Sequence, residues 1–213
     1  MLALTVAQLF TIHPDNPQLR LLKQAARILD DGGIGAIPTD SSFALVCHLD
    51  DKAAVDRIRQ LRRLDERHLM TLMCRDLSEI STYAQVDNAT YRLLRQSTPG
   101  PFTFILQATR ELPRRLSHPS RKTIGIRVPH HAVALGLLAQ LPEPLIATTL
   151  QLPGDLVPMT EAGEIRRRLQ HELELVVDSG SCGIQPTTVI DLTGTAPVVV
   201  RRGCGDPAAL GLA

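Results

Sequence analysis

Hydroxyl and guanidinium side chains follow several short apolar runs of this sequence. Thr39 to Ser42 comes directly after the run 34–38, and Thr148-Thr149 closes the run 145–149. Arg201-Arg202 ends a third run in the same way. Hydroxyls and guanidinium groups are donors that hold phosphate and carboxylate groups, and the guanidinium can do so with two parallel hydrogen bonds. An anion site is therefore predicted where these segments meet.

Helical periodicity and β-rich runs alternate along most of the chain. Helices are expected from the Asn16-Pro17 cap to Asp31, around 55–61, and over 77–84, 88–96, 131–141 and 164–170. Strands are expected over 34–38, 69–74, 102–107, 124–128, 145–149, 173–178, 188–192 and 198–201. This order favours an α/β fold with an open, twisted, mixed sheet and helices on its faces. In such sheets sites collect at the carboxyl ends of strands, where the polar segments above and His130 are expected.

Length and composition limit the class of protein. A chain of 213 residues with 44% hydrophobic and 21% charged residues is typical of one globular domain over 1–213, with its core at about 14–204. A net charge of +1 argues against adhesion to nucleic acid along the whole surface. The start Met1 to Leu4 lacks a basic leader, and the apolar runs are too short to span a bilayer, so a cytoplasmic protein without membrane contact is expected.

Several familiar motifs are missing from the sequence. There is no G-x-x-x-x-G-K-[ST], and Gly32 to Gly35 precedes its strand, so neither a P-loop nor a Rossmann fold is indicated. G-x-S-x-G and H-E-x-x-H are also absent. Four separate cysteines form no C-x-x-C pair, which predicts reduced thiols and no metal site.

Four segments follow one another in a distinctive order and spacing: Ile37 to Leu45, Thr98 to Thr103, Ile124 to Pro129 and Thr187 to Leu192. Together they resemble the YrdC/YciO family. The likeness covers almost the whole chain, as far as Val200-Arg201-Arg202-Gly203, and is stronger to the YciO branch. Phe10 to Pro17, Phe104 to Leu106, Pro113 to Leu116 and Lys122 to Gly125 carry that second likeness.

The resemblance implies the YrdC-like fold, also described as DHBP synthase RibB-like, with a large cationic cavity. In catalytic members it implies synthesis of threonylcarbamoyl-AMP from L-threonine, bicarbonate and ATP, a step in the modification of adenosine 37 of tRNA. A carbamate formed on threonine attacks the α-phosphate and expels pyrophosphate, so positioning and charge matter more than a covalent nucleophile. ATP, with Mg²⁺, would then be a substrate, and no tightly bound cofactor is expected.

Matching positions imply roles for individual residues. Arg62 and Arg127 are expected to act catalytically, and the substrate is expected to contact Thr39, Ser41, Arg127 and His130. Nucleotide contacts are expected from Arg62, Thr149, Gln151, Thr187 and Arg201. Three of these places have a structural alternative: an Asx-turn at 39–42, a surface cap residue at His130, and a surface arginine at Arg201.

The sequence also departs from the catalytic members. Their K-x-R pair is matched by Arg62 and Leu64, so one cation is lost, and their S-A-N segment by 149–151, with Pro153 in place of the serine that follows. Asp40 stands for a glutamate and Phe43 for a tyrosine. Leu150 and Pro153 are expected to alter the cavity wall, and the synthase activity is expected to be weak or altered.

Binding of double-stranded RNA or tRNA is the alternative function. Family members are described as binding double-stranded RNA through the basic concavity, which suits recognition of phosphate and shape. The residues expected to contact RNA are Arg57, Arg59, Arg62, Arg63, Arg67, Arg114, Arg115, Arg121 and Lys122. A charge run of this kind is also typical of a solvated helix face.

Overall fold

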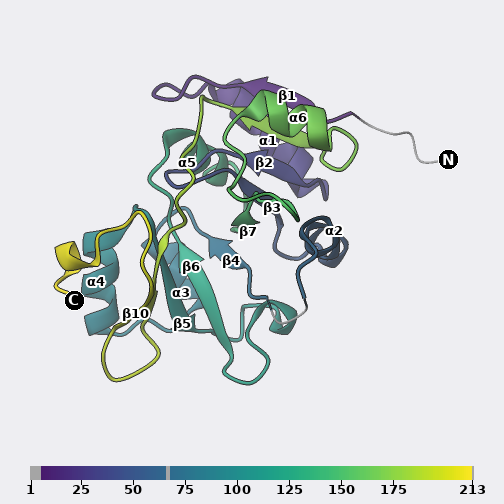
Figure 1. Ribbon diagram of the computed structural model, residues 1–213. Helices are drawn as coiled ribbons and strands as arrows, with labels where there is room; N and C mark the ends of the chain where they lie inside the picture. The colour runs from purple at the N-terminus through teal and green to yellow at the C-terminus, as the bar shows by residue number, and fades with distance from the viewer. Residues whose placement is uncertain (1–5, 66–67, 213) are drawn as a thin grey trace.

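One mixed sheet organises the protein, in a computed structural model that describes residues 6–65 and 68–212. Its strands within these residues are β1 (Gln8–Thr11), β2 (Gly35–Ile37), β3 (Ala44–His48), β4 (Thr71–Met73), β5 (Phe102–Gln107), β6 (Thr123–Arg127), β7 (Leu145–Thr149), β8 (Leu175–Asp178), β9 (Thr188–Asp191) and β10 (Val198–Arg201). Their order across the sheet is β1-β8-β2-β3-β7-β4-β6-β5-β9-β10. Strands near each other in the sheet are thus often distant in the sequence (Figure 1).

The sheet contains both parallel and antiparallel pairs, and the three successive pairs from β2 to β4 are antiparallel. β2 pairs in parallel with β8 and antiparallel with β3, while β4 pairs in parallel with β6 and antiparallel with β7. The predicted mixed α/β sheet in a single domain is therefore confirmed.

Helices cover both faces of the sheet. They are α1 (Leu19–Asp30), α2 (Lys52–Arg62), α3 (Leu77–Tyr83), α4 (Asn88–Ser97), α5 (Ala132–Leu138) and α6 (Ala162–Leu169), with the short 3₁₀ turns η1 (Arg114–Leu116) and η2 (Pro207–Leu210). α1 and α5 contact each other, α2 packs on β3, and α6 packs on β8. No described helix is long and apolar enough to cross a membrane.

The core consists of two apolar clusters on opposite faces of the sheet. In β3, Leu45 and Cys47 belong to the cluster under α2, α3, α4 and α6, whereas Ala44 and Val46 belong to the cluster under α1 and α5. Side chains of a strand alternate between faces, so one strand supplies both clusters. The second cluster, under α1 and α5, includes no residue of β5 or β9. On that side of the sheet, α1 and α5 therefore do not cover these two strands.

The structure differs from the sequence prediction in two unpredicted strands and in the bounds of several elements, among them the start of α1. β1 and β3 were not predicted as strands, and α1 begins at Leu19 rather than after Asn16-Pro17. The Nδ1 atom of His13 accepts the backbone N–H groups of Asp15 and Asn16, each at 3.2 Å. This local turn holds Asn16 outside the helix, and Gln18 takes the N-cap position without a side-chain cap bond.

Candidate functional site

A cavity of about 510 Å³ lies across the uncovered face of the sheet. It is lined by alternate residues of adjacent strands, among them Thr71 and Met73, Gly125 and Arg127, and Ala147 and Thr149. Their neighbours Leu72, Ile126 and Ile146 are buried in the core on the other face. The cavity includes the carboxyl ends of β6, β7 and β10, where Arg127, Thr149 and Arg201 lie. It also extends across the sheet face, because alternation sends every second side chain to the same side.

Small residues on the strands leave the room for this cavity. A Cβ atom on Gly125 of β6 would lie 3.3 Å from the Thr103 side chain and 3.6 Å from the Thr71 hydroxyl. Ala44 and Ala147 also line the cavity and fill little of it. Small side chains and backbone therefore form the floor of the cavity, and the longer arginine side chains form its walls.

Thr39 builds the turn that follows β2. Its hydroxyl donates to the Ser42 carbonyl at 2.7 Å and accepts the N–H groups of Ser41 and Ser42 at 3.2 and 3.3 Å. These bonds use the hydroxyl locally, as the Asx-turn alternative anticipated for this segment, although the side chain that closes the turn is a threonine. The turn aims Ser41 at β6, where its hydroxyl accepts a hydrogen bond of 3.1 Å from Arg127.

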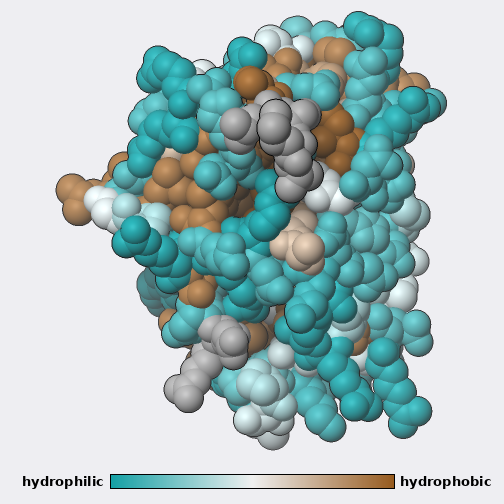
Figure 2. Space-filling model, turned by 90° about the vertical axis from the view of Figure 1, so that its right-hand side faces the viewer, coloured by the Kyte–Doolittle hydropathy of each residue, from teal (hydrophilic) through white to brown (hydrophobic). Residues whose placement is uncertain are grey.

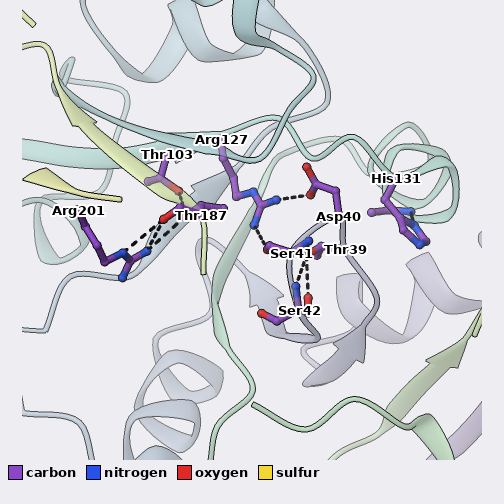
Figure 3. Close-up of polar contacts among 10 residues, drawn as sticks. Thr39, Asp40, Ser41, Ser42, Thr103, Arg127, His131, Thr187 and Arg201 are labelled. Atoms are coloured by element: carbon purple, nitrogen blue, oxygen red, sulfur yellow. Dashed lines mark hydrogen bonds and ion pairs between the residues drawn. The ribbon is translucent and has the colours of Figure 1, made fainter. Parts of the chain in front are cut away.

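Arg127, at the end of β6, forms an ion pair with Asp40 through its second terminal nitrogen (Figure 3). The two side chains are only 8% and 10% exposed. Burial lowers the pKa of the Arg127 guanidinium, and the Asp40 carboxylate opposes that change. The arginine is thus already paired within the protein.

Arg62 reaches the cavity from the last turn of α2. Its Nη1 donates to the Thr148 hydroxyl at 2.6 Å and its Nε to the Gln151 carbonyl at 2.9 Å. Burial lowers the pKa of this guanidinium too. Among the described residues, no carboxylate lies within 4.0 Å of it, so its charge is held by neutral oxygens only.

Arg201 and two threonines form the opposite wall. Arg201, at the end of β10, donates from Nη2 to the Thr187 carbonyl at 2.9 Å, and the Thr187 and Thr103 hydroxyl oxygens are 2.8 Å apart. Figure 3 shows Arg201 and Arg127 reaching toward the Thr187 and Ser41 segments from different strands. The Arg201 guanidinium also meets neutral oxygens, whereas Arg127 meets a carboxylate.

The structure brings together most of the predicted small-molecule site. The predicted residues that line the cavity are Thr39, Ser41, Arg62, Arg127, Thr149, Gln151, Thr187 and Arg201. His130 is exposed and lies outside the lining, because the chain turns after β6. The next residue, His131, is half-buried, caps α5 and lies beside Asp40 (Figure 3).

Three departures from the family pattern lie outside the cavity wall. Phe43 and Leu150 are fully buried in the core, and Pro153 is exposed and does not line the cavity. The expectation that Leu150 and Pro153 alter the wall is therefore wrong. Leu64 is partly buried and packs against the core.

Four of the predicted RNA-binding arginines hydrogen-bond to other parts of the protein, and four other predicted residues have exposed side chains. Arg57 is bonded to Glu174, Arg59 to the Asp65 carbonyl, Arg62 within the cavity, and Arg115 to the Leu49 carbonyl. The side chains of Arg63, Arg114, Arg121 and Lys122 are exposed. Arg67 lies outside the described residues. Arg115 places η1 beside the start of α2, so the two basic segments adjoin.

Some lining residues were not predicted. Thr103 belongs to one of the family-like segments, and Thr148 precedes a predicted site residue, so both carried a signal. Leu156, Val157 and Ile184 form an apolar lip, and Leu156 is 96% exposed. Their sequence pattern gives no signal. Figure 2 shows apolar residues gathered around a hollow in an otherwise largely hydrophilic face of the molecule.

This combination of a twisted mixed sheet and a cavity walled by arginines and hydroxyls defines a class of α/β proteins suited to anionic ligands. The family model described as telomere recombination, covering the Sua5, YciO and YrdC proteins, matches residues 27–203. The chain belongs to this family. The YciO protein of Escherichia coli K12 is 51% identical over 201 residues, which are 94% of this chain and 98% of that protein. Its crystal structure superposes with a TM-score of 0.91 over 96% of this chain and 99% of the other.

Catalytic relatives are more distant. The threonylcarbamoyl-AMP synthase of Mus musculus is 28% identical over 191 residues, which are 86% of this chain and 67% of that enzyme. Pyrococcus abyssi Sua5, in its complex with L-threonine, is 24% identical and superposes with a TM-score of 0.84 over 92% of this chain and 58% of its own. That structure supports the shared fold.

Proposed function

We propose that the cavity binds ATP, as its magnesium complex, with the triphosphate between Arg62 and Arg201. The supporting observation is that both guanidinium groups face the cavity and are held by carbonyl and hydroxyl oxygens. These partners position the cations without neutralising them. A phosphate can then gain charge-assisted hydrogen bonds, each worth about 1.5–3 kcal/mol.

The reaction we propose is a weak or altered threonylcarbamoyl-AMP synthesis. Relatives with 28% identity bear the name of that synthase. L-threonine would occupy the turn of Thr39 and Ser41 beside Arg127. Its amine nitrogen would bond to the carbon of bicarbonate as a carbon–oxygen bond breaks and water leaves, which gives a carbamate. A carbamate oxygen then bonds to the α-phosphorus as the bond from that phosphorus to the bridging oxygen breaks, and pyrophosphate leaves. Arg62 would offset charge that develops on the phosphates.

The expected weakness follows from the position that lacks a cation. Leu64 replaces the second member of the K-x-R pair and packs against the core instead of presenting a charge. Removing one preorganised donor from developing charge commonly costs about 10²- to 10³-fold in turnover. The protein is therefore expected to be slower than the catalytic branch.

Calorimetric titration with ATP, with and without L-threonine and bicarbonate, tests the binding step. Pyrophosphate release that requires all three substrates tests the reaction. We expect ATP binding and slow release, measured beside a threonylcarbamoyl-AMP synthase in the same buffer. Absence of ATP binding would refute the proposal, and a rate equal to that of the synthase would refute the role given to Leu64.

A second candidate is binding of double-stranded RNA along the exposed arginines of the α2 and η1 segments. The observation that favours it is the contact from Arg115 to the Leu49 carbonyl, which places η1 next to the loop that leads into α2. Phosphate recognition by such a surface would depend steeply on salt. Arg62 lies in the cavity and not among the exposed arginines, so variants of the exposed arginines can separate the two functions.

A further inference from the structure

The three cavity arginines are not equivalent. Arg62 and Arg201 contact only neutral oxygens among the described residues, whereas Arg127 contacts the Asp40 carboxylate. Asp40 also stands where the catalytic family members have a glutamate, which has a longer side chain. The subsite around Arg127 therefore carries a cation and its counter-ion together, and its net charge is near zero.

Arg127 and Asp40 bind each other, but not all of their hydrogen-bonding atoms have partners within the described chain. One Asp40 oxygen, Oδ2, and the Nε atom of Arg127 are both buried and have no hydrogen-bond partner within the described chain. The remaining contact of Arg127 is with the Ser41 hydroxyl. A buried charge that loses its partner is costly, commonly several kcal/mol, so Arg127 has little tendency to leave Asp40 for a weaker ligand.

Among the described residues, Arg127 is the one cation in an ion pair with Asp40. Burial lowers the pKa of His131, which favours the neutral imidazole beside Asp40. Burial also raises the pKa of the Cys182 thiol to about 11, so this neighbour stays uncharged at neutral pH. An anion that approached Arg127 would thus have to compete with the Asp40 carboxylate for the guanidinium and would be repelled by that carboxylate at close range.

We propose that Asp40 is a selectivity residue, which keeps Arg127 closed to plain anions such as inorganic phosphate. Anions that carry no positive charge of their own, such as inorganic phosphate, then bind only at the walls formed by Arg62 and Arg201. Arg127 becomes available to an anion only when the Asp40 charge is removed or is met by a cation. This inference concerns the charge of the subsite and does not depend on ATP being the ligand.

Inorganic phosphate is a suitable probe, with affinity measured by calorimetry and by the rise of the melting temperature with phosphate concentration. Asp40→Asn frees Arg127 without removing its hydrogen-bonding neighbour. We expect this variant to bind phosphate at least tenfold more tightly than the wild type, and to melt lower in a buffer without phosphate. Glu164→Gln is the matched control, since it removes one negative charge from an exposed pair with Arg168 on α6.

Two further variants complete the test. In the Asp40→Asn/Arg127→Met double variant the gain should vanish, because the freed guanidinium is gone. If the Asp40→Asn variant does not fold, the Asp40→Leu/Arg127→Met variant, which lacks both charges of the pair, is tested instead. A phosphate affinity within twofold of the wild type would support the proposal that Arg127 does not bind phosphate in the wild type. Tenfold weaker phosphate binding in that protein, or no gain in a folded Asp40→Asn protein, would overturn the proposal.

Discussion

Arg62 of α2 and Thr148 of β7 are joined by a hydrogen bond of 2.6 Å between Nη1 and the hydroxyl oxygen. A second bond, from Nε to the Gln151 carbonyl, fixes the other edge of the guanidinium. The long side chain is thereby held in one orientation at the cavity. A preorganised arginine loses little conformational entropy when a phosphate binds.

The Arg62→Ala variant should bind ATP at least tenfold more weakly, because about 1.4 kcal/mol corresponds to one decade and a charge-assisted bond is worth more. Calorimetric titration gives the dissociation constants. Arg57→Ala is the control: Arg57 lies on the same helix but pairs with Glu174 outside the cavity. Equal ATP affinity in folded Arg62→Ala protein would exclude Arg62 from the site.

The Gly203→Ala variant should lose both stability and ATP affinity. A Cβ atom there would lie 2.1 Å from the Pro186 carbonyl oxygen and 2.6 Å from the Thr187 carbonyl carbon, so the backbone that carries the Thr187 wall must move. We expect a loss of about 1–3 kcal/mol, as for other overpacked sites. Thermal melting and ATP titration check the two effects.

Gly163→Ala is the matched control for that substitution. A Cβ atom on Gly163, within α6, meets no atom within 4 Å. Alanine is favoured over glycine by about 1 kcal/mol in a helix interior and by less in the first turn, where Gly163 lies, so this variant should melt at the wild-type temperature or slightly higher. A Gly203→Ala protein as stable as the wild type would contradict the close contact with Pro186.

The free energy of unfolding should fall as the pH drops below 6.5, the ordinary pKa of histidine, and His131 should account for part of that fall. Burial lowers its pKa in the folded protein, so the unfolded chain binds the proton first and is favoured by acid. The Nδ1 atom also accepts the Ala134 N–H at 3.4 Å, and protonation removes this acceptor. Urea unfolding above and below pH 6.5 measures the effect.

The His131→Asn variant removes the titratable imidazole but keeps an N-cap residue at the start of α5, because asparagine is a good N-cap residue that does not titrate in this pH range. Its stability should depend less on pH than that of the wild type. Other groups also titrate, so only the difference between the two proteins is informative. Identical pH dependence of both proteins would show that His131 does not contribute.

Duplex RNA binding, where present, should weaken with salt, and the Arg63→Ala/Arg121→Ala variant should reduce the salt slope by about two counterions. Both side chains are exposed. Filter binding across a salt series measures the slope. Arg166→Ala/Arg167→Ala, two exposed residues of α6, is the control with the same loss of charge. No affinity for duplex RNA at low salt would dismiss this function.

Local patterns in the sequence predicted many elements well. The strands at Phe102–Gln107, Leu145–Thr149 and Val198–Arg201 have the predicted bounds, since their apolar and β-branched residues end at polar turns. β1 was missed because it is a short strand at the sheet edge. β3 was missed because its unbroken apolar run, buried on both faces, has no alternation to reveal it.

By itself the sequence determined the class of fold, the family, and several of the arginines and threonines that line the cavity, because residue type, order and spacing record these features. Only the tertiary structure decided that the cavity lies across a sheet face, since this depends on which strands adjoin and where helices stop. The pairing of Arg127 with Asp40 was also decided there. These two residues are far apart in the chain, and the partner of a charge is set by contacts in space, which no local pattern encodes.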